Sequence, residues 1–190
     1  MEKSYSNIRE LLQNNLLRDE EPKTKVLIEK LYHVKPAGYF TKPEFLDMCK
    51  WKDERQLRRS YWKANTEAEI IEISRQVFAT DDECKRIILL DKLKGVGIPV
   101  ASAILTLTDP QAYGVIDIRV WQVLHLYGEV NYNEKGTGLS IEHWIDYLPK
   151  LRLWASEFGV GVRNIERSLF EHHKIIQDDV LYKRSKTNNN

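Results

Sequence analysis

Apolar and polar residues alternate with the period of an α-helix over most of the chain. Apolar side chains recur at helical spacing in residues 5–17, 23–32 and 140–159. Three further segments open with threonine followed three positions later by glutamate, which is the capping box that starts a helix. They begin at Thr41, Thr66 and Thr80. The pattern predicts an all-α protein of about nine or ten helices.

Residues 115–126 can be interpreted in two ways. They are rich in β-branched side chains, which is typical of a strand. Ile118, Trp121 and Leu124 nevertheless fall at helical spacing, so we expect a buried helix that begins just after Asp117. Aspartate is among the most favoured residues at a helix N-cap, so Asp117 is on local grounds either the cap of this helix or a catalytic residue, and one role does not exclude the other.

The segment of residues 53–63 is basic and aromatic. Its arginines, together with Tyr61 and Trp62, suit a surface that binds a nucleic-acid strand. The alternative is a helix with Leu57 and Tyr61 facing inward and the arginines in solvent. The sequence leaves both interpretations open.

Composition limits the classes of function. The net charge is +1, so a nucleic-acid ligand would need a local basic patch, and this balance counts mildly against DNA binding. Cys49 and Cys84 are the only cysteines and form neither a metal-ligand series nor a disulfide framework. No stretch approaches the roughly 20 apolar residues of a membrane span, and the N-terminus lacks a signal-peptide core. We therefore expect a cytoplasmic protein with no membrane partner, and a monomer.

The most informative stretch is residues 93–121. It opens with Leu93-Lys94-Gly95-Val96-Gly97, a glycine hairpin between a helix expected to end near Asp91 and another expected to start at Pro99. Glycines let the backbone turn sharply and approach a ligand closely. We expect the amides of Val96, Gly97 and Ile98 to point outward at the positive end of the new helix, where they can bind a phosphate oxygen. A tight turn between packed helices is the alternative.

Downstream of this hairpin, Asp117 is a lone carboxylate within an apolar run. The order of hairpin, apolar helix, Pro110-Gln111-Ala112, Asp117 and Trp121 resembles the helix-hairpin-helix superfamily of DNA glycosylases, most nearly the eight-oxoguanine glycosylases. The close likeness covers residues 93–121, and the helical context extends it loosely to most of the chain.

The resemblance implies a fold of two helical lobes that flank a DNA-binding cleft. Residues 1–183 would form one domain, with residues 22–112 as the first lobe and residues 1–21 with 113–183 as the second. Residues 184–190 are expected to be a disordered tail.

The resemblance also implies a set of site residues. Asp117 would be catalytic, because a fixed carboxylate stabilises the oxocarbenium ion that forms when an N-glycosidic bond breaks. Trp51 and Trp62 are weak candidates for the base pocket. Contacts with double-stranded DNA would come from Lys94, Gly95, Val96, Gly97, Ile98 and Arg119. Backbone carbonyls of Asp91, Leu93 and Val96 are placed to hold a K⁺ or Na⁺ ion, and no other cofactor is expected.

Two features of the enzymes that the chain resembles are missing. Eight-oxoguanine glycosylases carry a Schiff-base lysine two residues past the second hairpin glycine, where this chain has Pro99, and Lys92 and Lys94 lie before or within the turn. No cysteine follows Cys84, so the iron–sulfur cluster of some relatives is absent. We therefore expect a monofunctional glycosylase that hydrolyses the bond and leaves an intact abasic strand.

Several questions stay open at the level of sequence. A helix-hairpin-helix module that binds DNA without chemistry is the main alternative, and a glycosylase scaffold reused for protein contacts is another. The excised base could be an oxidised, mismatched, alkylated or bulky modified base, in repair or in attack on foreign DNA.

Overall fold

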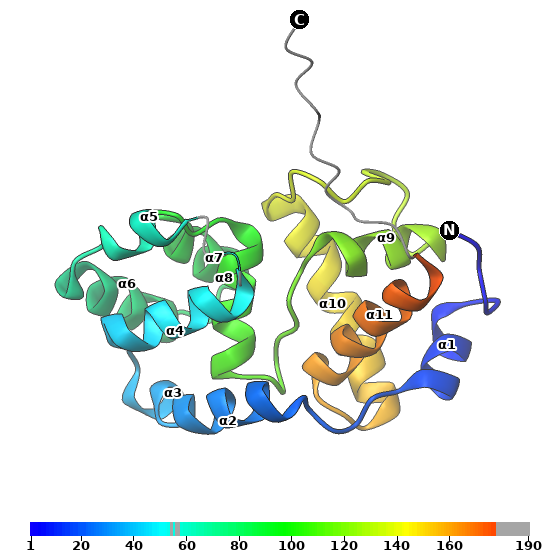
Figure 1. Ribbon diagram of the computed structural model, residues 1–190, viewed down its shortest axis with the longest axis horizontal. Helices are drawn as coiled ribbons and strands as arrows, with labels where there is room; N and C mark the ends of the chain where they lie inside the picture. Colours follow the sequence, from blue (N-terminus) through cyan, green and yellow to red (C-terminus); the bar gives the residue numbers. More distant parts are fainter. Residues whose placement is uncertain (54, 56–57, 178–190) are drawn as a thin grey trace, which may run out of the picture.

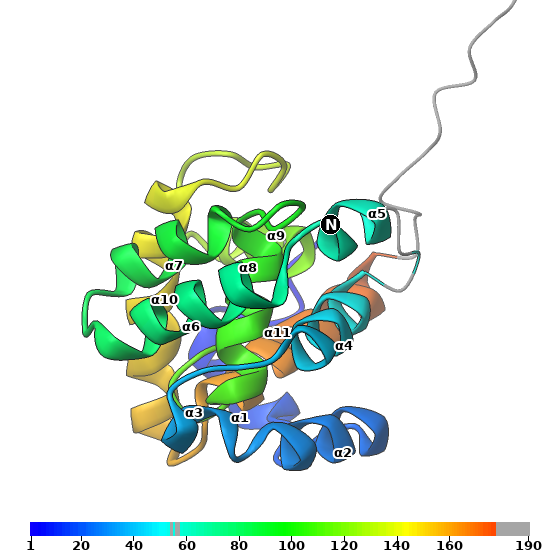
Figure 2. The ribbon, with the colours of Figure 1, turned by 90° about the vertical axis from the view of Figure 1, so that its left-hand side faces the viewer.

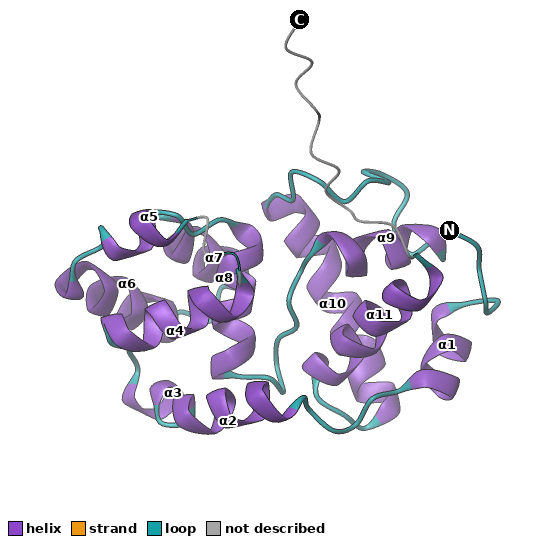
Figure 3. Cartoon of the chain, in the orientation of Figure 1, coloured by secondary structure: helices purple, strands orange, loops and turns teal. Residues whose placement is uncertain are grey.

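The computed structural model describes residues 1–53, 55 and 58–177. Within these residues the chain forms helices and loops and no strand (Figure 3), which confirms the all-α prediction. The helices are α1 (Ile8–Asn15), α2 (Pro22–Leu31), α3 (Val34–Ala37), α4 (Lys42–Lys52), α5 (Arg59–Lys63), α6 (Glu67–Ala79), α7 (Glu83–Asp91), α8 (Ile98–Thr108), α9 (Ile118–Leu126), α10 (Ile141–Phe158) and α11 (Val162–Ile176). Leu57 and the expected tail at residues 184–190 lie outside the described residues.

The helices fall into two groups (Figure 1). Helices α2–α8 contain the turn between α7 and α8, and we call them the hairpin group. Helix α1 with α9–α11 contains Asp117 at the start of α9, and we call these helices the aspartate group. Residues 16–21 and 109–117 run between the two groups. The turn and the aspartate, which the sequence places close together, therefore belong to different groups.

Helix α8 is the centre of the hairpin group. It packs against α2, α4 and α7, and the side view of Figure 2 shows it between α4 and α7. Its side chains are buried from Val100 to Thr108, which removes a mostly apolar helix from water. The hydroxyls of Thr106 and Thr108 donate to the carbonyls of Ser102 and Ile104, so these buried polar groups are paired.

The helix starts were predicted correctly at two of the three threonines. Thr41 and Thr66 form the expected capping boxes. The prediction at Thr80 is wrong, because the N-cap of α7 is Asp82, whose carboxylate accepts a hydrogen bond from the amide of Lys85 at 3.0 Å. Thr80 instead ends α6. Aspartate binds free helix amides at least as well as threonine, so the better cap two residues later sets the boundary.

A polar cluster joins α7 of the hairpin group to α10 of the aspartate group. Glu83 of α7 and Arg152 of α10 form an ion pair at 2.6 Å. The hydroxyl of Tyr113 donates to Glu83 at 3.0 Å and accepts a hydrogen bond from Arg86, while Arg152 also donates to the carbonyl of Ala112. Burial, reinforced by the charge of Glu83, raises the pKa of Tyr113 to about 12 and keeps its hydroxyl a donor. These contacts fix the two groups against each other.

The ambiguous stretch at residues 115–126 is helical. Helix α9 begins at Ile118 with Asp117 as its N-cap, which confirms both the helix and the cap. Among the described residues, no helix is long and apolar enough to cross a membrane.

Candidate active site

The backbone that leads to Asp117 is held from both groups of helices. The hydroxyl of Ser102, in α8, accepts a hydrogen bond from the amide of Ile116 at 3.1 Å. The buried hydroxyl of Tyr147, in α10, donates to the carbonyl of Val115 at 2.7 Å. These two hydrogen bonds hold the residues immediately before Asp117 in place, so Asp117 has little freedom to move.

The carboxylate of Asp117 divides its two oxygens between different partners. Oδ1 accepts hydrogen bonds from the amides of Arg119 at 2.9 Å and Val120 at 3.2 Å, which is the N-cap of α9. Oδ2 lies 3.2 Å from the ammonium of Lys52, the last residue of α4. The side chains of Asp117 and Lys52 are only 17% and 19% exposed, so solvent screens this ion pair poorly. The pair connects the aspartate group to the hairpin group at the position expected for catalysis.

A second carboxylate, Glu166 of α11, is buried near Asp117. It is paired with the guanidinium of Arg163, which also bonds Glu20 at 2.7 Å. Burial raises the pKa of Glu166, and the charge of Asp117 adds to that rise, while Arg163 opposes it. A Cβ at Gly114 would lie 2.8 Å from the Cβ of Glu166, so only glycine lets the chain pass this closely.

The turn between α7 and α8 is fastened to the segment of residues 58–65. The indole of Trp62 donates to the carbonyl of Gly95 at 3.0 Å. The side-chain amide of Asn65 bonds both the amide of Lys94, at 2.8 Å, and its carbonyl, at 3.1 Å. Gly95 has a φ of +82°, and a Cβ there would lie 2.8 Å from Trp62. Glycine is therefore required at this position both for its backbone conformation and for space.

One of the three turn amides that were predicted to point outward is bonded within the turn. The amide of Val96 donates to the carbonyl of Leu93 at 3.0 Å, so it does not point outward as expected. No hydrogen bond to another described residue engages the amides of Gly97 and Ile98, which precede and open α8. A Cβ on Gly97 would lie 3.5 Å from a guanidinium nitrogen of Arg58, which is exposed. The turn thus combines two backbone amides that no described residue bonds with a cation close to Gly97.

The carbonyls predicted to hold a cation surround the same turn. That of Leu93 accepts from Val96, whereas the carbonyls of Lys94 and Gly95 are taken by side chains. The set formed by Asp91, Leu93 and Val96 stays a prediction. Within the described part of the chain, no group of three or more histidine, cysteine, aspartate or glutamate side chains could hold a metal ion.

The aromatic candidates separate into different environments. Trp62 is 1% exposed beneath the turn, so it supports the hairpin and does not face an open base pocket. Trp51 is partly exposed, donates from its indole nitrogen to Thr24 at 2.9 Å and has the guanidinium of Arg163 5.2 Å from its ring. Tyr61 is 61% exposed, contrary to the interpretation that places it inward.

Arg119 is partly buried and held by α11. Its guanidinium donates to Nδ1 of His173 at 3.0 Å, and Nε2 of His173 bonds Gln122 at 2.7 Å. A guanidinium only donates, so Nδ1 of His173 is the acceptor and Nε2 carries the proton. His172 and His173 are both buried, although adjacent residues of a helix face different sides of it.

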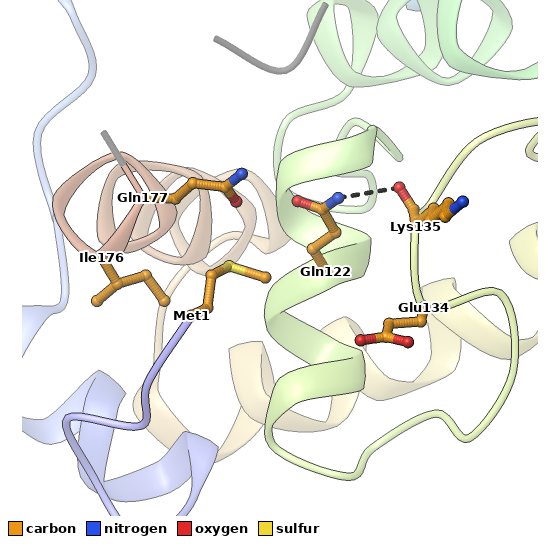
Figure 4. A pocket seen from close by; sticks show the side chains of 6 residues that line it. All are labelled: Met1, Gln122, Glu134, Lys135, Ile176 and Gln177. Atoms are coloured by element: carbon orange, nitrogen blue, oxygen red, sulfur yellow. Dashed lines mark hydrogen bonds between the residues drawn. The ribbon is translucent and has the colours of Figure 1, made fainter. Parts of the chain in front are cut away.

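An open depression of about 370 Å³ lies at the far end of this network (Figure 4). Gln122 lines it and donates to the carbonyl of Lys135 at 2.9 Å. The other lining residues are Met1, Glu134, Lys135, Ile176 and Gln177. None of the residues expected at the active site lines this depression.

No family model, no curated protein and no solved structure matches this chain.

Several residues at the site gave no signal in the sequence. Lys52 lies 65 positions before Asp117, and an ion pair over that distance has no local pattern. Ser102 and Tyr147 look like ordinary members of their helices. Arg58 belongs to the basic segment that the sequence singled out, but only the fold places it beside Gly97.

The histidine network predicts a pH dependence of stability. Burial, reinforced by the guanidinium of Arg119, lowers the pKa of His173 to about 4 from an ordinary value of 6.5. The unfolded chain then takes up a proton at higher pH than the folded one, so stability is lost as pH falls from about 6.5 to about 4. This loss amounts to at most about 3.4 kcal/mol.

We expect His173→Asn to lessen this decline in the free energy of unfolding, measured by urea denaturation across that pH range. His125→Asn, in the last turn of the neighbouring helix α9, is the control. An identical decline in the wild type and in His173→Asn would contradict the burial of a neutral His173.

Proposed function

We propose that this protein is a DNA glycosylase that hydrolyses the N-glycosidic bond of a damaged or modified base in double-stranded DNA. The observation that carries the proposal is the carboxylate of Asp117. Two amides fix one of its oxygens, and the other oxygen already faces a positive charge. A carboxylate held in this way can stabilise the positive charge that develops on the deoxyribose as the base departs.

The turn between α7 and α8 supplies the second part of the proposal. We interpret α7, the turn and α8 as a helix-hairpin-helix motif that binds a backbone phosphate through the amides of Gly97 and Ile98. Arg58 and Lys94 are exposed cations beside the turn and can neutralise the same phosphate, which answers the need for a local basic patch. A K⁺ or Na⁺ ion bound to carbonyls of the turn would also neutralise this phosphate.

The reaction follows from these two parts in the proposed complex. The hairpin and the aspartate groups would form the two lobes of a cleft, and the target base would leave the stack to enter it. Trp51, next to Lys52 at the end of α4, is the candidate to border the base. Asp117 would then stabilise the oxocarbenium ion and direct a water molecule to the sugar, which leaves an abasic site.

The first prediction tests the acid. Asp117→Asn should lower single-turnover base release by about 10³-fold, because it removes the charge but keeps a good N-cap. Its affinity for DNA should be equal or slightly higher. Release is measured on duplexes with oxidised, mismatched, alkylated or bulky modified bases and on modified phage DNA.

Asp82→Asn is the matched control, because Asp82 caps α7 through the same kind of contact but lies outside the site. It should leave release unchanged. If Asp117→Asn releases base as fast as the wild type, Asp117 is only a cap and the protein is better described as a DNA-binding module without chemistry.

The second prediction tests the turn. Gly97→Val should weaken binding to duplexes of every sequence alike, since it crowds a contact with the phosphate that carries no base information. Among the described residues, a Cβ at this position meets only Arg58, so the fold should survive. Affinity is measured by fluorescence anisotropy at several salt concentrations, and wild-type affinity should fall as salt rises.

Gly95→Ala is the contrasting variant. It should lower the melting temperature, because the new methyl group meets Trp62. Wild-type binding that does not depend on salt, or normal binding by Gly97→Val, would contradict the phosphate contact.

A further inference from the structure

The ion pair between Lys52 and Asp117 joins a potential proton donor to the proposed catalytic acid. Nζ of Lys52 lies 3.2 Å from Oδ2 of Asp117, and both side chains are largely buried. The other oxygen of Asp117 is committed to the amides that start α9. Oδ2 is therefore the oxygen available to the sugar, and Lys52 is already beside it.

This arrangement raises an electrostatic difficulty for the proposed reaction. The cation that forms on the sugar and the ammonium of Lys52 would both be drawn to the same carboxylate oxygen. Two positive charges a few ångströms apart in a poorly solvated site repel each other strongly. The difficulty disappears if Lys52 gives up its proton as the sugar becomes positive, since one positive charge then replaces the other.

We propose that Lys52 is the acid that protonates the departing base. This inference rests on the proposed glycosylase function and deepens it. A lysine ammonium carries a proton at neutral pH, and general acid catalysis of this kind contributes about 10²-fold or more to a rate.

The proton balance closes within the pair. The bond between C1′ and the base nitrogen breaks, its electron pair goes to the base, and the base takes a proton from Lys52. A water oxygen then bonds C1′ and gives its proton to Asp117. That proton passes across the 3.2 Å contact to the neutral amine of Lys52, which restores the ion pair. One water is consumed and one neutral base is released.

Other polar groups near Asp117 are less suited to this role. Arg119 is bound to His173, and a guanidinium does not give up its proton. The carboxylate of Glu166 is buried and already paired with the guanidinium of Arg163. Lys52 is the described group that combines a transferable proton with direct contact to Asp117.

The role of Lys52 defines a class of substrate. A base that is uncharged in DNA leaves as an anion unless it is protonated, so it needs an acid. A purine alkylated on a ring nitrogen is already cationic, leaves as a neutral molecule and gains nothing from one. We therefore infer that the substrate is an uncharged base, such as an oxidised purine or a substituted pyrimidine.

The test compares two bases that differ in how easily they leave as anions. Single-turnover release is measured for a base that the wild type excises from the duplex panel and for its ring-halogenated analogue, whose anion leaves more easily. Lys52→Gln should lose about 10²-fold on the parent base and less than about 10-fold on the analogue. Lys52→Arg, which keeps the charge and the ion pair, should also lose rate on the parent base because it cannot transfer a proton.

Lys50→Gln is the control, since Lys50 is an exposed lysine on the same helix. It should not change the ratio of the two rates. Equal losses on both bases in the Lys52 variants, or full activity in Lys52→Arg, would show that Lys52 only positions Asp117.

Borohydride trapping separates a third outcome. A covalent protein–DNA adduct that forms with the wild type and disappears in Lys52→Arg would make Lys52 a nucleophile and overturn this role. Failure of the glycosylase function itself is distinguishable, because the wild type would then release no base from the panel, or Asp117→Asn would release it at the wild-type rate.

Discussion

The structure of the site depends on how the carboxylate of Asp117 is shared. Two backbone amides at the start of α9 hold one oxygen, and this contact sets both where the helix begins and where the charge sits. Ser102 and Tyr147 fix the residues just before it. The remaining oxygen meets a cation from another part of the fold. Capping and catalysis are therefore compatible roles for Asp117, because each uses a different oxygen.

The turn between α7 and α8 and the aspartate sit on different groups of helices, so the proposed site exists only when the groups are correctly placed. The polar cluster around Glu83 and Arg152 provides that placement, and the ion pair of Lys52 with Asp117 adds a contact at the site itself. Trp62 and Asn65 hold the turn in place. No described residue bonds the amides of Gly97 and Ile98.

Local signals in the sequence predict the helices well, and contacts over long distances in the chain account for what they miss. Helical periodicity and caps identify α9, the N-cap at Asp117 and the capping boxes at Thr41 and Thr66. The start of α7 is missed because Thr80 and Asp82, two positions apart, can both serve as caps. Lys52 and the burial of His173 depend on helices far apart in sequence, which no local pattern encodes. The orientation of the Val96 amide is missed because this amide donates within the turn, to the carbonyl of Leu93.

The central claim is that Asp117 stabilises a positive charge on the sugar, and it can be measured without knowing the base. The affinity for a duplex with a cationic pyrrolidine in place of one nucleotide is compared with that for a neutral tetrahydrofuran analogue. We predict that the wild type prefers the cationic duplex by about 10-fold, or about 1.4 kcal/mol, and that Asp117→Asn loses this preference. Lys52→Gln should increase it, because a competing positive charge is gone. Equal wild-type affinity for both duplexes would contradict the account.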